Sequence, residues 1–119
     1  MSGKIAIIIV SGLDQKPKVM SGLHVAKRIY DARKENDIET VEVFLFTGGV
    51  IMLDHNAENS DVLNIIKELR ESNILIGACS NQVQSYNLEE QFKTRGINLE
   101  FARDAFSRYA RENFTVITF

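Results

Sequence analysis

The sequence predicts an α/β protein built on a parallel β-sheet. Strand-like and helix-like segments alternate from end to end, as a repeated strand–helix pattern that closes with a strand. The first strand-like run, residues 5–10, is apolar throughout and mostly β-branched, which is typical of a strand covered by helices on both faces. Right-handed helical crossovers join parallel strands in such an order.

Size and composition indicate an ordinary globular domain. The chain has 119 residues, of which 45% are hydrophobic and 25% charged, and it carries a formal net charge of −2. We therefore expect one domain over residues 1–119, with no general affinity for nucleic acid or for an anionic membrane surface. The N-terminal apolar run is too short to span a membrane. The single cysteine cannot form an internal disulfide, so we expect a cytoplasmic protein.

The first half of the chain contains two predicted strands, one helix and a short turn or helix. After a loop over residues 11–17, apolar residues recur at helical spacing over residues 18–36. Residues 41–46 form the second predicted strand, which Thr47, Gly48 and Gly49 interrupt before a short turn or helix over residues 50–53.

Capping residues predict the next two helices. Ser60 is expected to cap a helix that ends near residue 72, and residues 74–78 form a strand that leads directly into Cys79. Ser80 and Asn81 are expected to cap a short helix that runs to about residue 86. Asn87 is then suited to close that helix in the left-handed conformation.

The last third of the chain predicts two strands around a helix. Residues 97–101 alternate in polarity like a half-exposed strand, and residues 114–119 form the final strand. The intervening helix is predicted from an apolar stripe that comprises Ala102, Ala105, Phe106, Tyr109 and Ala110. We expect its arginines, Arg103, Arg108 and Arg111, to solvate its outer face.

Cys79 is the residue that points most directly to chemistry. Ligands and reactive groups of open parallel sheets lie beyond the carboxyl ends of the strands, where the loops 11–17, 47–53 and 79–81 are expected. Backbone N–H groups at a strand-to-helix junction favour a thiolate, which can attack sulfane sulfur or form a mixed disulfide. Alternatively, Cys79 is a small apolar residue packed under the loop.

Other candidate residues surround the same edge. Gly12, Gly48 and Gly49 could form a rim at which the backbone approaches a small ligand closely, or they could simply form tight turns. His55 follows the Gly-Gly turn and could support a nucleophilic Cys79. No spacing of His, Cys or carboxylate residues indicates a zinc site, and no phosphate-loop or dinucleotide motif is present, so we expect no metal or cofactor.

The chain resembles the DsrE/DsrF-like family, which includes small sulfur-relay subunits. The resemblance rests on the strand at residues 5–10, the Phe-Leu-Phe-Thr-Gly-Gly-Val segment at 44–50 and the Ile-Gly-Ala-Cys-Ser-Asn segment at 76–81. It continues through residues 86–88, where Asn87 stands in place of a usual glycine, and to the closing strand. It covers nearly the whole chain.

The resemblance implies a three-layer α/β/α sandwich on a five-stranded, mainly parallel sheet, assembled into homo- or hetero-oligomers such as trimers or hexamers. It implies that Cys79 accepts sulfur as a persulfide from a donor protein and passes it to an acceptor. Such a protein is a sulfurtransferase-type carrier rather than a turnover enzyme. The expected rim around Cys79 comprises Gly12, Gly48, Gly49, Val50, Ser80 and Asn81, with His55 as an auxiliary residue.

Three functions thus stay open at the level of sequence. The first is a persulfide carrier that uses Cys79. The second is a non-catalytic module that binds a small ligand or assembles into an oligomer, with a structural Cys79. The third is an enzyme that pairs Cys79 with His55.

Overall fold

Five parallel strands form one sheet in the order β4-β3-β2-β1-β5. The computed structural model describes residues 2–119. The strands are β1 (Gly3–Ile9), β2 (Ile38–Leu45), β3 (Leu75–Cys79), β4 (Asn98–Glu100) and β5 (Thr115–Thr118). The predicted α/β class and the parallel five-stranded sheet are confirmed, and each strand lies within a few residues of its predicted position.

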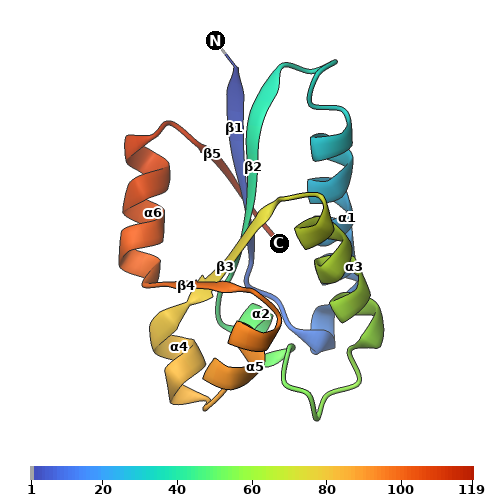
Figure 1. The fold of residues 1–119 in the computed structure, drawn as a ribbon, viewed down its shortest axis with the longest axis vertical. Helices are drawn as coiled ribbons and strands as arrows, with labels where there is room; N and C mark the ends of the chain where they lie inside the picture. Colours follow the sequence, from blue (N-terminus) through green and yellow to red (C-terminus); the bar gives the residue numbers. More distant parts are fainter. Residues whose placement is uncertain (1) are drawn as a thin grey trace.

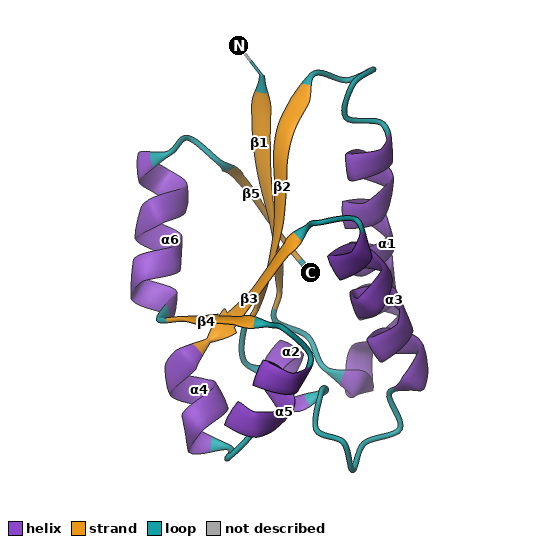
Figure 2. Cartoon of the chain, in the orientation of Figure 1, coloured by secondary structure: helices purple, strands orange, loops and turns teal. Residues whose placement is uncertain are grey.

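Helices cover both faces of the sheet and produce the predicted three layers. Helices α1 (Lys16–Asp31) and α3 (Ser60–Glu71) lie on one face, and α6 (Ala102–Arg111) lies on the other (Figure 1). Three short helices gather at the carboxyl ends of the strands (Figure 2): α2 (Gly48–Ile51), α4 (Ser80–Ser85) and α5 (Glu89–Thr94). A short 3₁₀ turn, η1 (Leu13–Gln15), precedes α1.

The two layers of helices enclose two apolar cores of unequal size. The larger core lies between the sheet and helices α1 and α3, and it includes Ile7, Ile9 and Leu69. The smaller core lies under α6 and comprises Ala6, Ile8, Phe44, Cys79, Ala105 and Tyr109. Successive residues of a strand point to opposite faces, so the part of a strand that lies between two cores must be apolar at every position, as β1 is from Ile5 to Ile9.

The first helix begins earlier and ends earlier than predicted. Pro17 stands in the first turn of α1, where a missing backbone N–H costs nothing, so the helix starts at Lys16 instead of residue 18. It ends at Asp31, well before residue 36. The connection to β2 then turns through Asp37, whose φ of 56° lies in the left-handed region.

The predicted caps of α3 and α4 are wrong by one position. Asn59, and not Ser60, precedes α3, and its side-chain amide donates to the carbonyl of Met52 at 2.6 Å instead of capping the helix. Cys79 itself precedes α4, so Ser80 and Asn81 lie inside that helix without a side-chain capping bond. The prediction for Asn87 is confirmed, because its φ is 56°.

Two features of the last third differ from the prediction. Helix α5 is not among the elements predicted from the sequence, because six residues are too few for a clear helical pattern. In α6, only Ala105 and Tyr109 of the predicted stripe are buried, whereas Phe106 and Ala110 are exposed. Phe106 is 38% exposed although its ring packs edge-on against Phe44 of β2 at a centroid distance of 5.5 Å.

Within residues 2–119, no helix has the length and apolar character that crossing a lipid bilayer requires.

Candidate functional site

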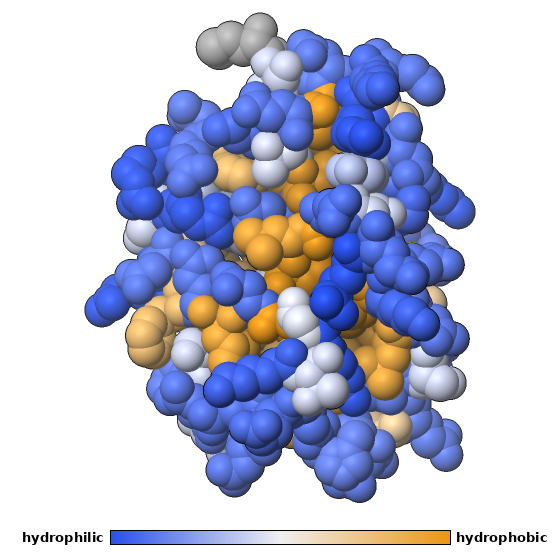
Figure 3. All heavy atoms as spheres, viewed as in Figure 1, coloured by the Kyte–Doolittle hydropathy of each residue, from blue (hydrophilic) through white to orange (hydrophobic). Residues whose placement is uncertain are grey.

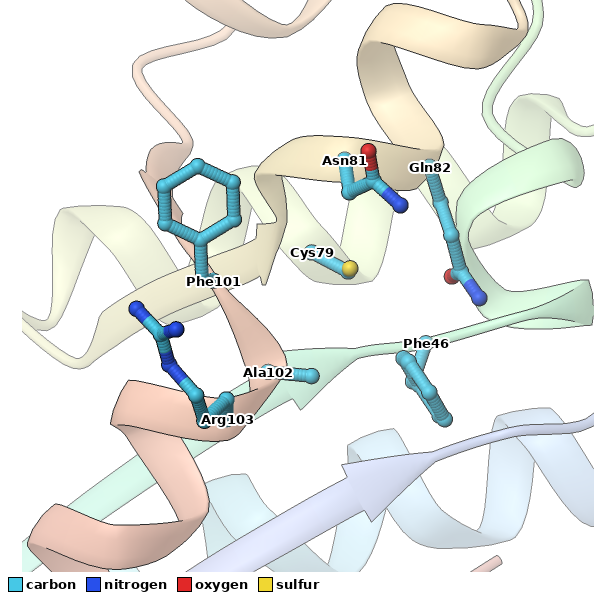
Figure 4. A pocket seen from close by; sticks show the side chains of 7 residues that line it. All are labelled: Phe46, Cys79, Asn81, Gln82, Phe101, Ala102 and Arg103. Atoms are coloured by element: carbon cyan, nitrogen blue, oxygen red, sulfur yellow. The ribbon is translucent and has the colours of Figure 1, made fainter.

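A cavity of about 400 Å³ lies beyond the carboxyl ends of the neighbouring strands β2, β3 and β4. The first turns of α4 and α6 close it on two sides (Figure 4). Its walls are formed by Phe46, Cys79, Asn81, Gln82, Phe101, Ala102 and Arg103. This is the edge at which parallel sheets generally bind ligands.

The Cys79 side chain lies on the floor of this cavity. Cys79 is the last residue of β3, is 4% exposed and belongs to the core under α6. Figure 4 shows its sulfur directed into the open space, with Asn81 above it and Gln82 to one side. Cys79 is therefore both a packed residue of the core and part of the cavity lining.

The turn after β2 holds one wall of the cavity in place. The backbone N–H of Thr47 donates to the side-chain oxygen of Gln82 at 2.7 Å, and its hydroxyl donates to the carbonyl of Val10 at 2.8 Å. Thr47 has a φ of 54°, which is strained for a β-branched residue. These bonds tie the β2 turn to α4 and to the end of β1, and they stabilise the strained conformation.

The predicted glycine rim has a packing role in this structure. A Cβ on Gly49 would lie 2.2 Å from the carbonyl oxygen of Ile9, and one on Gly48 would lie 2.7 Å from the backbone nitrogen of Gly12. The glycines thus let the turn after β2 pack against the backbone at the end of β1. Neither they nor Val50, which is fully buried, line the cavity.

Of the residues predicted around Cys79, only Asn81 lines the cavity with it. Ser80 is not among the lining residues. His55 lies in the loop between α2 and α3, where its side chain is 63% exposed and its Nδ1 is 3.5 Å from Asp54. The structure therefore does not bring His55 into the cavity that contains Cys79. Within residues 2–119, no cluster of metal-ligating side chains occurs.

Five of the lining residues were not expected at a site from the sequence: Phe46, Gln82, Phe101, Ala102 and Arg103. Phe46 and Phe101 directly follow β2 and β4, so their position after a strand could have indicated them. Gln82 carried no such signal, because its role depends on a hydrogen bond to Thr47, 35 residues away.

Arg103 stands at the mouth of the cavity instead of only solvating α6. Its side chain is 81% exposed and pairs with Asp104 at 3.0 Å, and the hydrogen bond that the guanidinium donates to this carboxylate raises the pKa of Arg103. In Figure 4 the guanidinium is turned away from the sulfur of Cys79. In this conformation Arg103 contributes a wall and a nearby positive charge, without direct contact to the thiol.

An apolar groove of about 310 Å³ borders the cavity along the edge strand β5. Phe46 lines both spaces, and its ring packs edge-on against Phe106 at a centroid distance of 5.6 Å. The remaining groove residues are Ile8, Val10, Phe106, Tyr109, Val116 and Thr118. Val116 is 48% exposed and belongs to β5, the strand at this edge of the sheet.

Arg108 fixes α6, and with it one wall of the cavity. The prediction that it only solvates the helix is wrong, because its guanidinium bonds Glu42 of β2 at 2.9 Å and Glu100 of β4 at 3.1 Å. The hydrogen bond with Glu42, followed by that with Glu100, raises the pKa of Arg108. The buried Glu42 thereby finds its partner, and α6 is held across three strands.

Three solved structures share this fold. BT1422, a conserved protein of unknown function from Bacteroides thetaiotaomicron, superposes with a TM-score of 0.74 at 16% identity over 96% of this chain and 94% of its own. MTH1491, a protein of unknown function from Methanobacterium thermoautotrophicum, has a TM-score of 0.73 at 17% identity over 98% and 99%. The ychN protein from E. coli has a TM-score of 0.72 at 13% identity over the full length of both chains.

No protein-family model matches the sequence, and no curated protein matches it either. At such low identity, the three structures establish a common architecture and not a common activity. The chain is therefore similar in fold, over nearly its whole length, to these three proteins, two of which are described as proteins of unknown function.

Proposed function

We propose that this protein carries sulfur as a persulfide on Cys79. The observation that supports the proposal most directly is the position of the sulfur. The chain's only cysteine is buried in the core, yet it lines an open cavity at the carboxyl edge of a parallel sheet. A carrier needs one accessible thiol and no second cysteine, because the partner's thiol completes the transfer.

The proposed reaction is an exchange at sulfur. The Cys79 thiolate attacks the terminal sulfur of a donor persulfide, R–S–SH. A new bond forms between Sγ and that sulfur while the S–S bond of the donor breaks, so the products are Cys79–S–SH and the thiolate R–S⁻. A thiolate of an acceptor protein then attacks the same terminal sulfur and releases Cys79. Charge and oxidation state balance in both steps, and no cofactor takes part.

The cavity suits the bound sulfur chain. Its floor is apolar, with Ala102 and Phe46, while the side-chain amides of Asn81 and Gln82 lie at its upper edge (Figure 4). The oxygen of Gln82 already accepts from Thr47, so its NH₂ is the group available to a sulfur anion. Limited solvent access would protect a persulfide from side reactions.

We also propose that the protein functions as a homo-oligomer, such as a trimer or hexamer, in the cytoplasm. The apolar groove along β5 supports this assembly, because it includes half-exposed Val116 and Phe106 beside an unpaired strand edge. Since Phe46 lines both spaces, a second copy on this groove would lie next to the Cys79 cavity. A free cysteine persists in a reducing compartment.

The alternative function is a binding or assembly module in which Cys79 is only a wall of the cavity. The 4% exposure of Cys79 favours this alternative, because most buried cysteines are inert. The two functions differ in the chemistry of the native thiol, so one experiment separates them.

The experiment is intact-protein mass spectrometry of the native protein after incubation with a low-molecular-weight persulfide. The proposal predicts a gain of one sulfur atom that a reducing agent reverses. Cys79→Ser should fold normally and gain no sulfur. Addition of a second, thiol-bearing protein should remove the extra sulfur from the wild type.

A native protein that gains no sulfur would reject the carrier function. If Cys79 also resists a small alkylating reagent until the protein is unfolded, the binding module becomes the better assignment. His55→Ala serves as a further control, because a carrier that does not use this histidine should accept sulfur at the wild-type rate.

A further inference from the structure

A second cavity shares no lining residue with the Cys79 cavity, and three of its own lining residues are positively charged. It has a volume of about 280 Å³ and lies between α3 and the turn that follows α5. Lys67 and Arg70 border it from α3, and Arg95 borders it from the end of α5. Its other walls are Leu63, Asn64 and Ile66. No carboxylate lines it, although the protein as a whole carries a net negative charge.

The spacing on α3 explains how the cavity is built. Leu63, Lys67 and Arg70 follow one another at intervals of four and three residues, so they lie on one face of the helix. Ile66 is 2% exposed and forms an apolar floor next to the half-buried Leu63. Figure 3 shows strongly hydrophilic residues beside hydrophobic ones in the region where α3 approaches α5 and β4 in Figure 1.

Arg70 is held in place by the chain segment opposite α3. A Cβ on Gly96 would lie 2.1 Å from an Nη atom of Arg70, so the guanidinium lies directly against the Gly96 backbone. Gly96 has a φ of +68°, which also favours glycine at this position. Among residues 2–119, neither Arg70 nor Lys67 has a carboxylate within ion-pair distance.

Arg95 approaches the same space from the other side. One of its guanidinium nitrogens donates to the carbonyl of Leu53, which orients the group. Burial lowers the pKa of Arg95, and the negative charge of Asp54 only partly opposes this effect. The Asp54 carboxylate already accepts hydrogen bonds from Asn56. Glu90 shares a shallower neighbouring depression with Arg95 but does not line this cavity.

We propose that this cavity binds a phosphate monoester with a small organic group. Two guanidinium groups and one ammonium group can surround a dianionic phosphate, since guanidinium forks match the spacing of its oxygens. The apolar floor of Leu63 and Ile66 would contact the organic part. The volume leaves room for more than the phosphate alone, as is usual for a metabolite site with few polar anchors.

Isothermal titration calorimetry on the native protein at low salt tests the site, with inorganic phosphate and phenyl phosphate as probes. We expect saturable binding of both, with phenyl phosphate the tighter ligand, and no binding of phenol. Losing a hydrogen bond to a charged group should weaken phenyl phosphate binding roughly tenfold in Arg70→Gln. Lys67→Gln should weaken it to a smaller degree, and added salt should weaken binding to the wild type.

Two further variants control for the loss of a positive charge elsewhere and for misfolding. Arg111→Gln removes an exposed arginine of α6 and should bind phenyl phosphate like the wild type. Lys67 is exposed and unpaired among residues 2–119, so Lys67→Gln should fold even if Arg70→Gln does not. The proposal is overturned if phenyl phosphate does not bind, if phenol binds equally well, or if the folded Lys67 and Arg70 variants both retain wild-type affinity.

Discussion

Arg108 forms a two-pronged ion pair with Glu42, in which Nη1 and Nη2 donate to the two carboxylate oxygens at 3.1 and 2.9 Å. The pair joins α6 to β2, across 66 residues of sequence, and Glu42 is 8% exposed. It anchors the last turn of α6 to the sheet, and the first turn of the same helix carries Ala102 and Arg103 of the Cys79 cavity.

Arg108→Met should destabilise the protein by about 3 kcal/mol, because it leaves the Glu42 charge buried without a partner. Urea unfolding measures the loss. The double variant Glu42→Leu with Arg108→Met should recover most of it, and Arg111→Ala on the same helix should change the free energy of unfolding little. A single-variant effect equal to that of Arg111→Ala would contradict the role of the pair.

The ion pair raises the pKa of Arg108 in the folded state. Its contribution to the free energy of unfolding is therefore fully present at every pH below the pKa of this guanidinium in the unfolded chain, so it should persist through neutral pH.

Gly49→Ala should destabilise the protein by about 3 kcal/mol, because the new methyl group would meet the carbonyl oxygen of Ile9. Thermal or urea unfolding gives the value. Gly77→Ala is the comparison and should cost less, because its methyl group would lie 3.2 Å from a ring carbon of Phe44 and not 2.2 Å from a backbone oxygen. Equal stabilities of the two variants would show that the turn after β2 tolerates a side chain.

Ala102→Phe should slow the alkylation of Cys79 by iodoacetamide roughly tenfold, which corresponds to about 1.4 kcal/mol in the barrier. The added ring would fill the cavity through which a reagent reaches the sulfur. Ala110→Phe places the same ring on the exposed side of α6 and should leave the rate unchanged. If both variants react like the wild type, access to Cys79 does not pass through this cavity.

Lys16→Ala should raise the pKa of Asp61 toward its ordinary value of 3.8, because the hydrogen bond from Lys16, at 2.8 Å, is the main cause of its lowering. An NMR titration of the Asp61 carboxyl resonance measures this change. Since the folded-state pKa is lowered, the contact stabilises the protein above pH 3.8 and is lost as pH falls through the folded-state pKa. An unchanged Asp61 titration would show that the ion pair between α1 and α3 does not persist in solution.

The sequence predicted the architecture because its signals are local. The apolar run of β1 and the strand-to-helix junction at Cys79 each depend on neighbouring residues, and both are confirmed. The left-handed Asn87 is also confirmed, since asparagine tolerates that conformation. Helix caps were predicted less well, because Asn59 uses its side chain for Met52 instead of for α3.

The candidate site was only partly predictable. The order of strands and helices predicted that the site lies at the carboxyl edge of the sheet and includes Cys79. Gln82 and Ala102 come together only through contacts between segments that are distant in sequence. Arg108 resembled an ordinary surface arginine in sequence, because its partner Glu42 lies on another element. The same limit explains why the cavity of Arg70 and Arg95 had no sequence signal.

The sequence by itself thus determined the alternation of strands and helices, the burial of β1 on both faces, and the place of Cys79 at a strand end. Local propensity and polarity patterns suffice for these features. Only the tertiary structure decided which side chains share a cavity, and it separated His55 and the glycines from the walls around Cys79. The reason is physical: such groupings depend on the packing of helices across the sheet, and that packing is a property of the whole chain.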